Sequence, residues 1–231
     1  MLTKVSAPML MNLPRTIHLR RPPVLSVQGG VFLPANHLLE EVERRWHTLC
    51  QSNPAYFDGR LYHVLGVHRN GHGGATLHVV ESAYRFFAVQ DHQFDVGMRA
   101  LGLKGITIRN DRVLMGRRSM NVAAYQGMWE FAPAGSAEPG KPTAEVIQQE
   151  LLEETGLKSV REPTPLAMLF DPVLRCWEVV YRLHADDDDS PKPRTAEYTQ
   201  LEWHELDELP RELSPIARQI APLLATARHM K

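Results

Sequence analysis

In the amino-terminal part of the chain, the period of the apolar positions changes along the sequence and marks the expected elements. A helix is predicted before Asn53-Pro54, because apolar residues recur at helical spacing among charged ones: Leu38, Leu39, Val42, Trp46 and Leu49. Looser alternation over 60–68 and 75–80, on either side of a glycine-rich turn, predicts a β-hairpin. Residues 1–34 are expected to be irregular or strand-like, so this part reads as β-rich with one helix.

Beyond residue 100 the alternation becomes regular and predicts a unit of mixed α/β type. A helix is predicted over 143–155, with Thr143 as its N-cap and Gly156 closing it, and a last helix from Pro215 to about 227. Strands are predicted at 101–108, 113–115, 128–131, 165–170, 174–183 and 198–203.

Composition excludes several classes of protein. A hydrophobic fraction of 43% and a charged fraction of 23% over 231 residues are ordinary for a soluble globular chain. The apolar runs fall far short of the ~20 residues that a membrane span needs, and a net charge of -1 lacks the basic excess of a nucleic-acid binder. Cys50 and Cys176 fit neither a disulfide framework nor a zinc site, which favours a cytoplasmic protein. The acidic run Asp186–Asp189 is expected to be a surface loop.

The stretch 135–157 carries the side chains with a candidate chemical role. A loop rich in glycine and proline leads into it, which lets the backbone bend sharply and approach a ligand. On the helix that follows, Glu150 and Glu154 are four residues apart and stack on one face, with Glu153 beside them. Like charges at this spacing repel, and a bridging Mg²⁺ or Mn²⁺ would remove the repulsion. The alternative is an ordinary charged helix surface that faces solvent.

The same stretch resembles the Nudix box, the signature of the Nudix hydrolases. The strand and loop before the box and the strand and helix after it also resemble the family, over about 100–228. The resemblance implies an α/β fold, a Nudix-type α/β/α sandwich with a mixed sheet, at 99–231, and a β-rich N-terminal extension at 1–98. The residues that match the spacing of the box are Gly135, Glu150, Leu151, Glu153, Glu154, Gly156 and Leu157.

The resemblance implies metal-dependent hydrolysis of a nucleoside diphosphate linked to another moiety, of the nucleotide-sugar or ADP-ribose type, with Mg²⁺ or Mn²⁺ as cofactor. Catalytic roles are implied for Glu153, Glu154 and Glu197, the last in the loop before the final predicted strand. An isoprenoid diphosphate isomerase shares the fold, but neither Cys50 nor Cys176 stands where its catalytic cysteine would be expected. The implied metal ligands are Gly135, Glu150, Glu153 and Glu154.

Three basic residues are candidates for contacts with substrate phosphates. Arg117 and Arg118 follow a predicted strand, and a planar guanidinium matches a phosphate, although a surface pair is the alternative. Lys141 and Gln149 stand where the family commonly has a glutamate and an arginine that form a supporting ion pair. Lys141 is expected to approach a phosphate or a helix glutamate such as Glu145. The departures also allow a catalytically weak Nudix-fold nucleotide-binding or sensor module.

Two features point to different substrates. The patterns at Asn53-Pro54 and Phe57-Asp58-Gly59 faintly resemble the amino-terminal extension of Nudix enzymes that cleave UDP-sugars. Pro172 lies 15 residues beyond Leu157, a spacing associated with ADP-ribose hydrolases. The extension is expected either to cover the substrate pocket or to form the interface of a homodimer.

Overall fold

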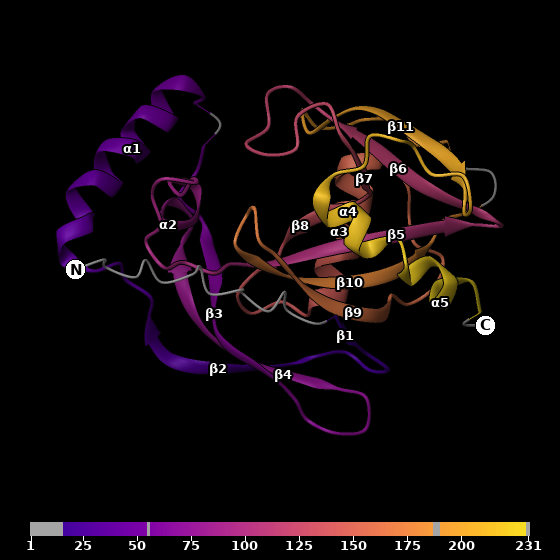
Figure 1. Cartoon of the computed structure of the whole chain (residues 1–231), viewed down its shortest axis with the longest axis horizontal. Coiled ribbons are helices and arrows are strands. Elements are labelled where there is room, and N and C mark those ends of the chain that lie inside the picture. The colour runs from indigo at the N-terminus through magenta and orange to yellow at the C-terminus, as the bar shows by residue number, and fades with distance from the viewer. Residues whose placement is uncertain (1–15, 55, 187–189, 230–231) are drawn as a thin grey trace, which may run out of the picture.

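A mixed β-sheet forms the centre of the carboxyl-terminal part of the protein in a computed structural model that describes residues 16–54, 56–186 and 190–229 (Figure 1). Within these residues its strands are β1 (Ile17–His18), β5 (Leu101–Arg109), β6 (Arg112–Arg118), β7 (Trp129–Phe131), β8 (Ala134–Ser136), β9 (Thr164–Asp171), β10 (Cys176–His184) and β11 (Tyr198–Glu205). Their order is β1-β9-β10-β5-β6-β11, with β7 paired to β6 and β8 paired to β5. Strand β5 runs parallel to β10 and antiparallel to β6 and β8, so the sheet is mixed as expected.

Helices cover both faces of this sheet. On one face, Ile147 of the box helix packs in a cluster with Leu103 of β5. On the other face, Ile216 packs with Ile106. This arrangement confirms the α/β/α sandwich. The helices are α3 (Thr143–Thr155), α4 (Pro215–Ile220) and α5 (Leu223–His229).

The prediction of one continuous helix from Pro215 to about 227 is wrong. The structure contains two short helices there, α4 and α5, separated by Ala221 and Pro222. Proline has no amide hydrogen to donate and its ring clashes with the preceding turn, so Pro222 ends α4 and a new helix starts after it.

The ends of α3 agree with the sequence at one terminus and differ at the other. Gly156 ends the helix in the left-handed conformation with a φ of 80°, as a glycine at this position predicts. The predicted N-cap is wrong, because Pro142 occupies that position. The hydroxyl of Thr143 instead lies 2.7 Å from the hydroxyl of Tyr181 in the core.

The amino-terminal extension adds a second, smaller sheet in the order β2-β4-β3 beside the main one (Figure 1). Leu77 of this sheet packs in the same cluster as Ile147 of α3, so the two parts share a core. Val42 of the helix Leu39–Ser52 and Phe86 of the helix Tyr84–Ala88 lie in a separate cluster. The predicted hairpin and first helix are present. The elements are β2 (Val24–Val31), the 3₁₀ helix η1 (Asn36–Leu38), α1 (Leu39–Ser52), β3 (Arg60–Arg69), β4 (Ala75–Ala83) and α2 (Tyr84–Ala88).

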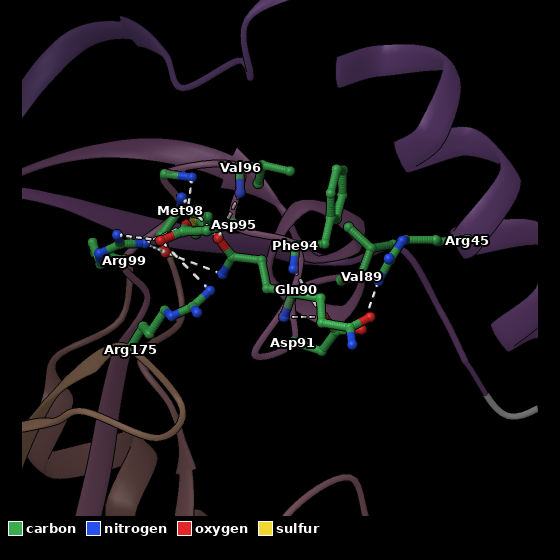
Figure 2. Close-up of polar contacts among 12 residues, drawn as sticks. Arg45, Val89, Gln90, Asp91, Phe94, Asp95, Val96, Met98, Arg99 and Arg175 are labelled. Carbon is green, nitrogen blue, oxygen red and sulfur yellow. Dashed lines mark hydrogen bonds and ion pairs between the residues drawn. The ribbon is translucent and has the colours of Figure 1, made fainter.

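The segment 89–99, which joins the extension to β5, is held by ion pairs from both sides (Figure 2). Asp91 pairs with Arg45 of α1 at 2.7 Å. Asp95 lies 3.5 Å from Arg175, in the turn between β9 and β10. The pair of Asp95 and Arg175, with the shared core, fixes the extension against the rest of the chain.

A buried histidine, His63, joins β3 to the segment 89–99. It is buried, its Nδ1 accepts a hydrogen bond from the amide of Arg99 at 3.0 Å, and its ring stacks on Phe32 with the ring centres 4.2 Å apart. Burial lowers the pKa of His63 to about 4, and the charge of Arg99 contributes.

We therefore expect folding stability to fall as the pH drops from about 6.5 to about 4. The unfolded state binds a proton at His63 in this window and the folded state does not, which costs up to roughly 3 kcal/mol. Urea unfolding across this range should show a smaller loss for His63→Gln than for the wild type. The exposed His92 supplies the matched control, His92→Gln. Equal pH slopes for wild type and His63→Gln would contradict the assignment.

The described residues include no helix that is both long and apolar enough to cross a bilayer. The predicted surface loop at Asp186–Asp189 lies, apart from Asp186, outside the described residues, and so do residues 1–15 of the region expected to be irregular.

Candidate functional site

The box loop and the box helix meet at Gly135 and Glu150. Gly135 lies in β8, a short strand that pairs with β5 beside α3. A Cβ atom at position 135 would overlap the carboxylate of Glu150. Only glycine therefore lets this carboxylate lie directly against the backbone of the loop.

Glu154 is buried in the last turn of the same helix. Its side chain is 2% exposed, and its Oε2 accepts a hydrogen bond from the amide of Ala134 at 3.0 Å. Its Oε1 has no hydrogen-bond partner among the residues that the structure describes. The reading of these glutamates as a charged surface that faces solvent is therefore wrong for Glu154, and a buried carboxylate oxygen without a partner needs an explanation.

Glu197 reaches the same region from the loop before β11. Its Oε2 accepts a hydrogen bond from Arg118 at 2.7 Å, and its backbone carbonyl accepts one from the amide of Ser119, also at 2.7 Å. These two bonds fix the position of a residue that is distant from the box in sequence.

A cavity of about 620 Å³ opens between the box loop and the extension. The box side contributes Gly135, Glu138 and Glu150, and Glu197 lies in the same wall. The extension contributes the facing wall, which includes Asn53, Tyr56, Phe57, Gly59 and Tyr84. The extension therefore covers the acidic end of the site, in agreement with one of its two expected roles.

Burial and mutual repulsion raise the free energy needed to ionise the carboxylates of this site together. Burial raises the pKa of Glu150 to about 7, and the charges of Glu153 and Glu197 contribute. Burial also raises the pKa of Glu154 well above its usual value, with Glu197 the next contribution. A divalent cation reverses this preference, because it stabilises the ionised carboxylates.

The donor set fits a hard divalent cation. Carboxylates of Glu150 and Glu154 and the carbonyl of Gly135 are oxygen donors, which Mg²⁺ and Mn²⁺ prefer. The buried Oε1 of Glu154, which lacks a hydrogen-bond partner, is an independent structural reason to place a cation here, because the cation would coordinate it.

The two departures from the box pattern make new local contacts. Lys141 pairs with Glu138 at 2.7 Å rather than with Glu145, the helix glutamate expected from the sequence. Gln149 donates a hydrogen bond to Glu153 at 2.6 Å. Glu153 is exposed, and the structure places neither it nor Lys141 in the cavity wall.

The two adjacent arginines point to opposite faces of the sheet. Arg118 bonds to Glu197 at the cavity. Arg117 donates a hydrogen bond to the carbonyl of Gly127 at 3.1 Å and lies 3.8 Å from Glu212. The structure therefore brings Arg118 to the site and directs Arg117 away from it.

A buried ionic network supports the site from within the sheet. Lys104 of β5 pairs with Glu130 of β7 at 3.1 Å, and the two side chains are 8% and 2% exposed. Glu130 also accepts a hydrogen bond from Ser214 at 2.9 Å and lies 4.0 Å from Arg118. Despite burial, Lys104 and Arg118 hold the pKa of Glu130 below its usual value. The sequence feature that could have indicated this network is Lys104, a lysine inside the apolar strand predicted at 101–108.

Asp171, Cys176 and Glu178 form a second cluster of potential ligand atoms, within 4.8 Å of one another. Most of these potential ligand atoms already take part in hydrogen bonds. Asp171 accepts from the hydroxyl of Tyr125 at 2.6 Å and from two backbone amides, and the Cys176 thiol donates to Glu178 at 3.2 Å. Burial raises the pKa of Cys176 well above its usual value, so the thiol is protonated and a poor metal ligand.

Comparison with known families and structures gives the following matches. A family model described as the NUDIX domain matches residues 98–224, more than half of the chain. No curated protein matches the chain.

Several solved structures are similar to the carboxyl-terminal part. A MutT NUDIX hydrolase from Burkholderia pseudomallei is 23% identical, with a TM-score of 0.47, over 53% of this chain and 95% of that one. A MutT protein from Methanosarcina mazei Go1 is 18% identical, with a TM-score of 0.48, over 56% and 95% of the two chains. A bifunctional NMN adenylyltransferase/ADP ribose pyrophosphatase from Francisella tularensis is 20% identical, with a TM-score of 0.43, over 55% and 41%.

Proposed function

The chain belongs to the Nudix hydrolase family, and on that premise we propose that it hydrolyses a nucleoside diphosphate linked to another moiety, of the nucleotide-sugar or ADP-ribose type. The products are a nucleoside monophosphate and the phosphorylated second moiety. Water adds to one phosphorus, the bridging oxygen leaves with the other phosphate, and the proton of the water passes to a carboxylate of the protein.

Glu150, Glu154 and the Gly135 carbonyl would hold the divalent ion that the family uses, Mg²⁺ or Mn²⁺ in this proposal. Such a cation would supply positive charge to neutralise phosphate oxygens and would make a water molecule more acidic. The orphaned and buried Oε1 of Glu154, next to Glu150, is the observation that carries the proposal. Glu153 is the remaining ligand of the family pattern, and its exposed position suits a role through water.

Glu197 is the stronger of the two candidates for the general base. It lies in the cavity wall, and Arg118 fixes its carboxylate at 2.7 Å. Glu153 is instead exposed and lies outside the cavity wall. Arg118 and Lys141 are the candidates for phosphate contacts, because both are cationic and each pairs with a glutamate of the cavity wall, Glu197 and Glu138 respectively.

The departures at Lys141 and Gln149 are compatible with turnover. The ion pair that the family has between these positions is replaced by separate contacts to Glu138 and Glu153, so neither replacement leaves a buried charge without a partner. A nucleotide-binding module without turnover is the competing function, and it requires these changes to disturb the cation site.

Product analysis on a substrate panel tests the proposal. UDP-sugars, ADP-ribose, dinucleotides and nucleoside triphosphates are incubated with Mg²⁺ or Mn²⁺, and in parallel with a chelator. We expect chelator-sensitive cleavage of one class of diphosphate to a nucleoside monophosphate. Intact substrates from folded protein that still binds a nucleotide would favour the binding module.

The proposal also covers the domain division, the cellular location and the oligomeric state of the enzyme. Residues 1–98 are the extension and 99–231 the Nudix domain, a division supported by the family model, which begins at residue 98. A cytoplasmic location is supported by the free state of Cys50 and Cys176. Size-exclusion chromatography with light scattering tests the predicted homodimer.

A further inference from the structure

Phe57 is an exposed aromatic side chain at the mouth of the cavity. Its side chain is 80% exposed, the highest value among the large apolar residues described as exposed. It stands in the cavity wall opposite Gly135 and Glu150. An apolar ring left in water beside an acidic site gains free energy when a ligand covers it.

Two tyrosines extend this aromatic surface into the cavity. The rings of Tyr56 and Tyr84 are 6.3 Å apart and inclined by 27°, and both residues line the cavity. Trp46 of α1 packs edge-on against both rings, at 6.0 Å and 6.2 Å. We call Tyr56, Phe57 and Tyr84 the aromatic wall.

Backbone and side-chain bonds hold Asp58 and Gly59, which follow Phe57, against the start of α2. The carboxylate of Asp58 accepts a hydrogen bond from the amide of Arg85 at 2.8 Å, at the start of α2. The amide of Tyr84 donates to the carbonyl of Gly59, also at 2.8 Å. The ion pair between Asp91 and Arg45 joins α1 to the segment after α2 (Figure 2). The backbone at Tyr84 and the carboxylate of Asp58, next to Phe57, are therefore held in place before a ligand binds, which lowers the entropic cost of binding.

The two sides of the cavity suit different parts of one ligand. The acidic side, with Glu150 and Glu197, suits a cation and the phosphates it neutralises, and it repels an anion on its own. The aromatic wall offers flat, largely uncharged surface, on which a planar ring stacks. A volume of about 620 Å³ is within the range of small-molecule sites and is larger than a diphosphate alone requires.

We propose that the aromatic wall of the extension, with Phe57 as its exposed member, is a subsite that stacks the nucleobase of the substrate. This inference rests on the proposed function for the identity of the ligand. It assigns base recognition to the extension and phosphate chemistry to the Nudix domain.

Calorimetric binding of nucleoside monophosphates tests the subsite without any turnover. UMP and AMP are titrated in the presence of Mg²⁺ into the full chain, and ribose 5-phosphate serves as the probe that lacks a base. We expect Phe57→Ala to weaken binding of at least one nucleotide by about 10-fold and to leave ribose 5-phosphate unchanged. Phe57→Trp, which keeps a stacking ring, should retain wild-type affinity.

Removal of another exposed apolar side chain controls for general surface effects. Leu33 also lies in the extension, is 66% exposed and is not part of the cavity wall, so Leu33→Ala should bind both probes as the wild type does. Equal losses for nucleotide and ribose 5-phosphate, unchanged nucleotide binding in Phe57→Ala, or no nucleotide binding by the wild type would each overturn the subsite. Binding that depends on Phe57 without chelator-sensitive hydrolysis would overturn the proposed function and leave the subsite standing.

Discussion

Replacing Glu154 with glutamine is expected to lower turnover by about 100-fold or more and to leave the protein folded. The amide oxygen of glutamine can still accept the hydrogen bond from Ala134, so the local backbone keeps its partner. The change removes the negative charge at one of the two buried carboxylate oxygens that lack a partner among the described residues, the other being Oε2 of Glu178. Turnover of the cleaved substrate with saturating Mg²⁺ measures the loss.

The same variant separates the role in cation binding from a role in folding. Glu154 is buried beside Glu150 and Glu197, and burial disfavours its charge, so without a cation Glu154→Gln should be at least as stable as the wild type. Mg²⁺ at about 100 times its Kd should raise the free energy of unfolding of the wild type by about 2.7 kcal/mol and that of the variant by much less. Thermal unfolding with chelator and with Mg²⁺ measures both.

Glu145→Gln is the matched control for this experiment. Glu145 is an exposed glutamate in the first turn of the same helix, and its loss should leave turnover and the Mg²⁺ shift unchanged. If Glu154→Gln turned over substrate like the wild type, the assignment of the cation site would be wrong.

The box was predictable from the sequence because its signals are local. The 3.6-residue spacing that places Glu150 and Glu154 on one helix face, and the glycine that ends the helix, are fixed by residues that are neighbours in the chain. The burial of Glu154 was not predictable in this way. It depends on β8, whose first residue, Ala134, donates its amide to the Glu154 carboxylate.

Residues that reach the site from other strands were harder to assign. Arg117 and Arg118 are adjacent in sequence, and a strand sends neighbouring side chains to opposite faces, so only the strand register decides which one meets Glu197. The aromatic wall depends on contacts between residues far apart within the extension, such as those of Trp46 with Tyr56 and Tyr84. Only the faint resemblance at Phe57-Asp58-Gly59 pointed to this part of the chain before the structure was known.

Glu130→Gln is expected to destabilise the protein by about 3–5 kcal/mol, because it leaves the buried charge of Lys104 without its ionised partner. For a chain of this size, this loss lowers the melting temperature by roughly 10 °C. The hydrogen bond from Ser214 can persist, since glutamine keeps an acceptor oxygen, so the loss reports the ionic contact. Chemical unfolding at neutral pH measures the free energy.

A double-mutant cycle shows whether the loss comes from the pair itself. Lys104→Met removes the uncompensated charge, so Lys104→Met with Glu130→Gln should be less destabilised than the sum of the single variants. The exposed pair of Arg112 and Glu205, with side chains 53% and 45% exposed, supplies the control. Glu205→Gln should change the free energy of unfolding by less than about 1 kcal/mol. Additive losses in the cycle would show that Lys104 and Glu130 act separately.

Glu130 also lies beside Arg118, which donates a hydrogen bond to Glu197. A loss of turnover in folded Glu130→Gln would therefore show that this network positions Glu197 in the cavity wall.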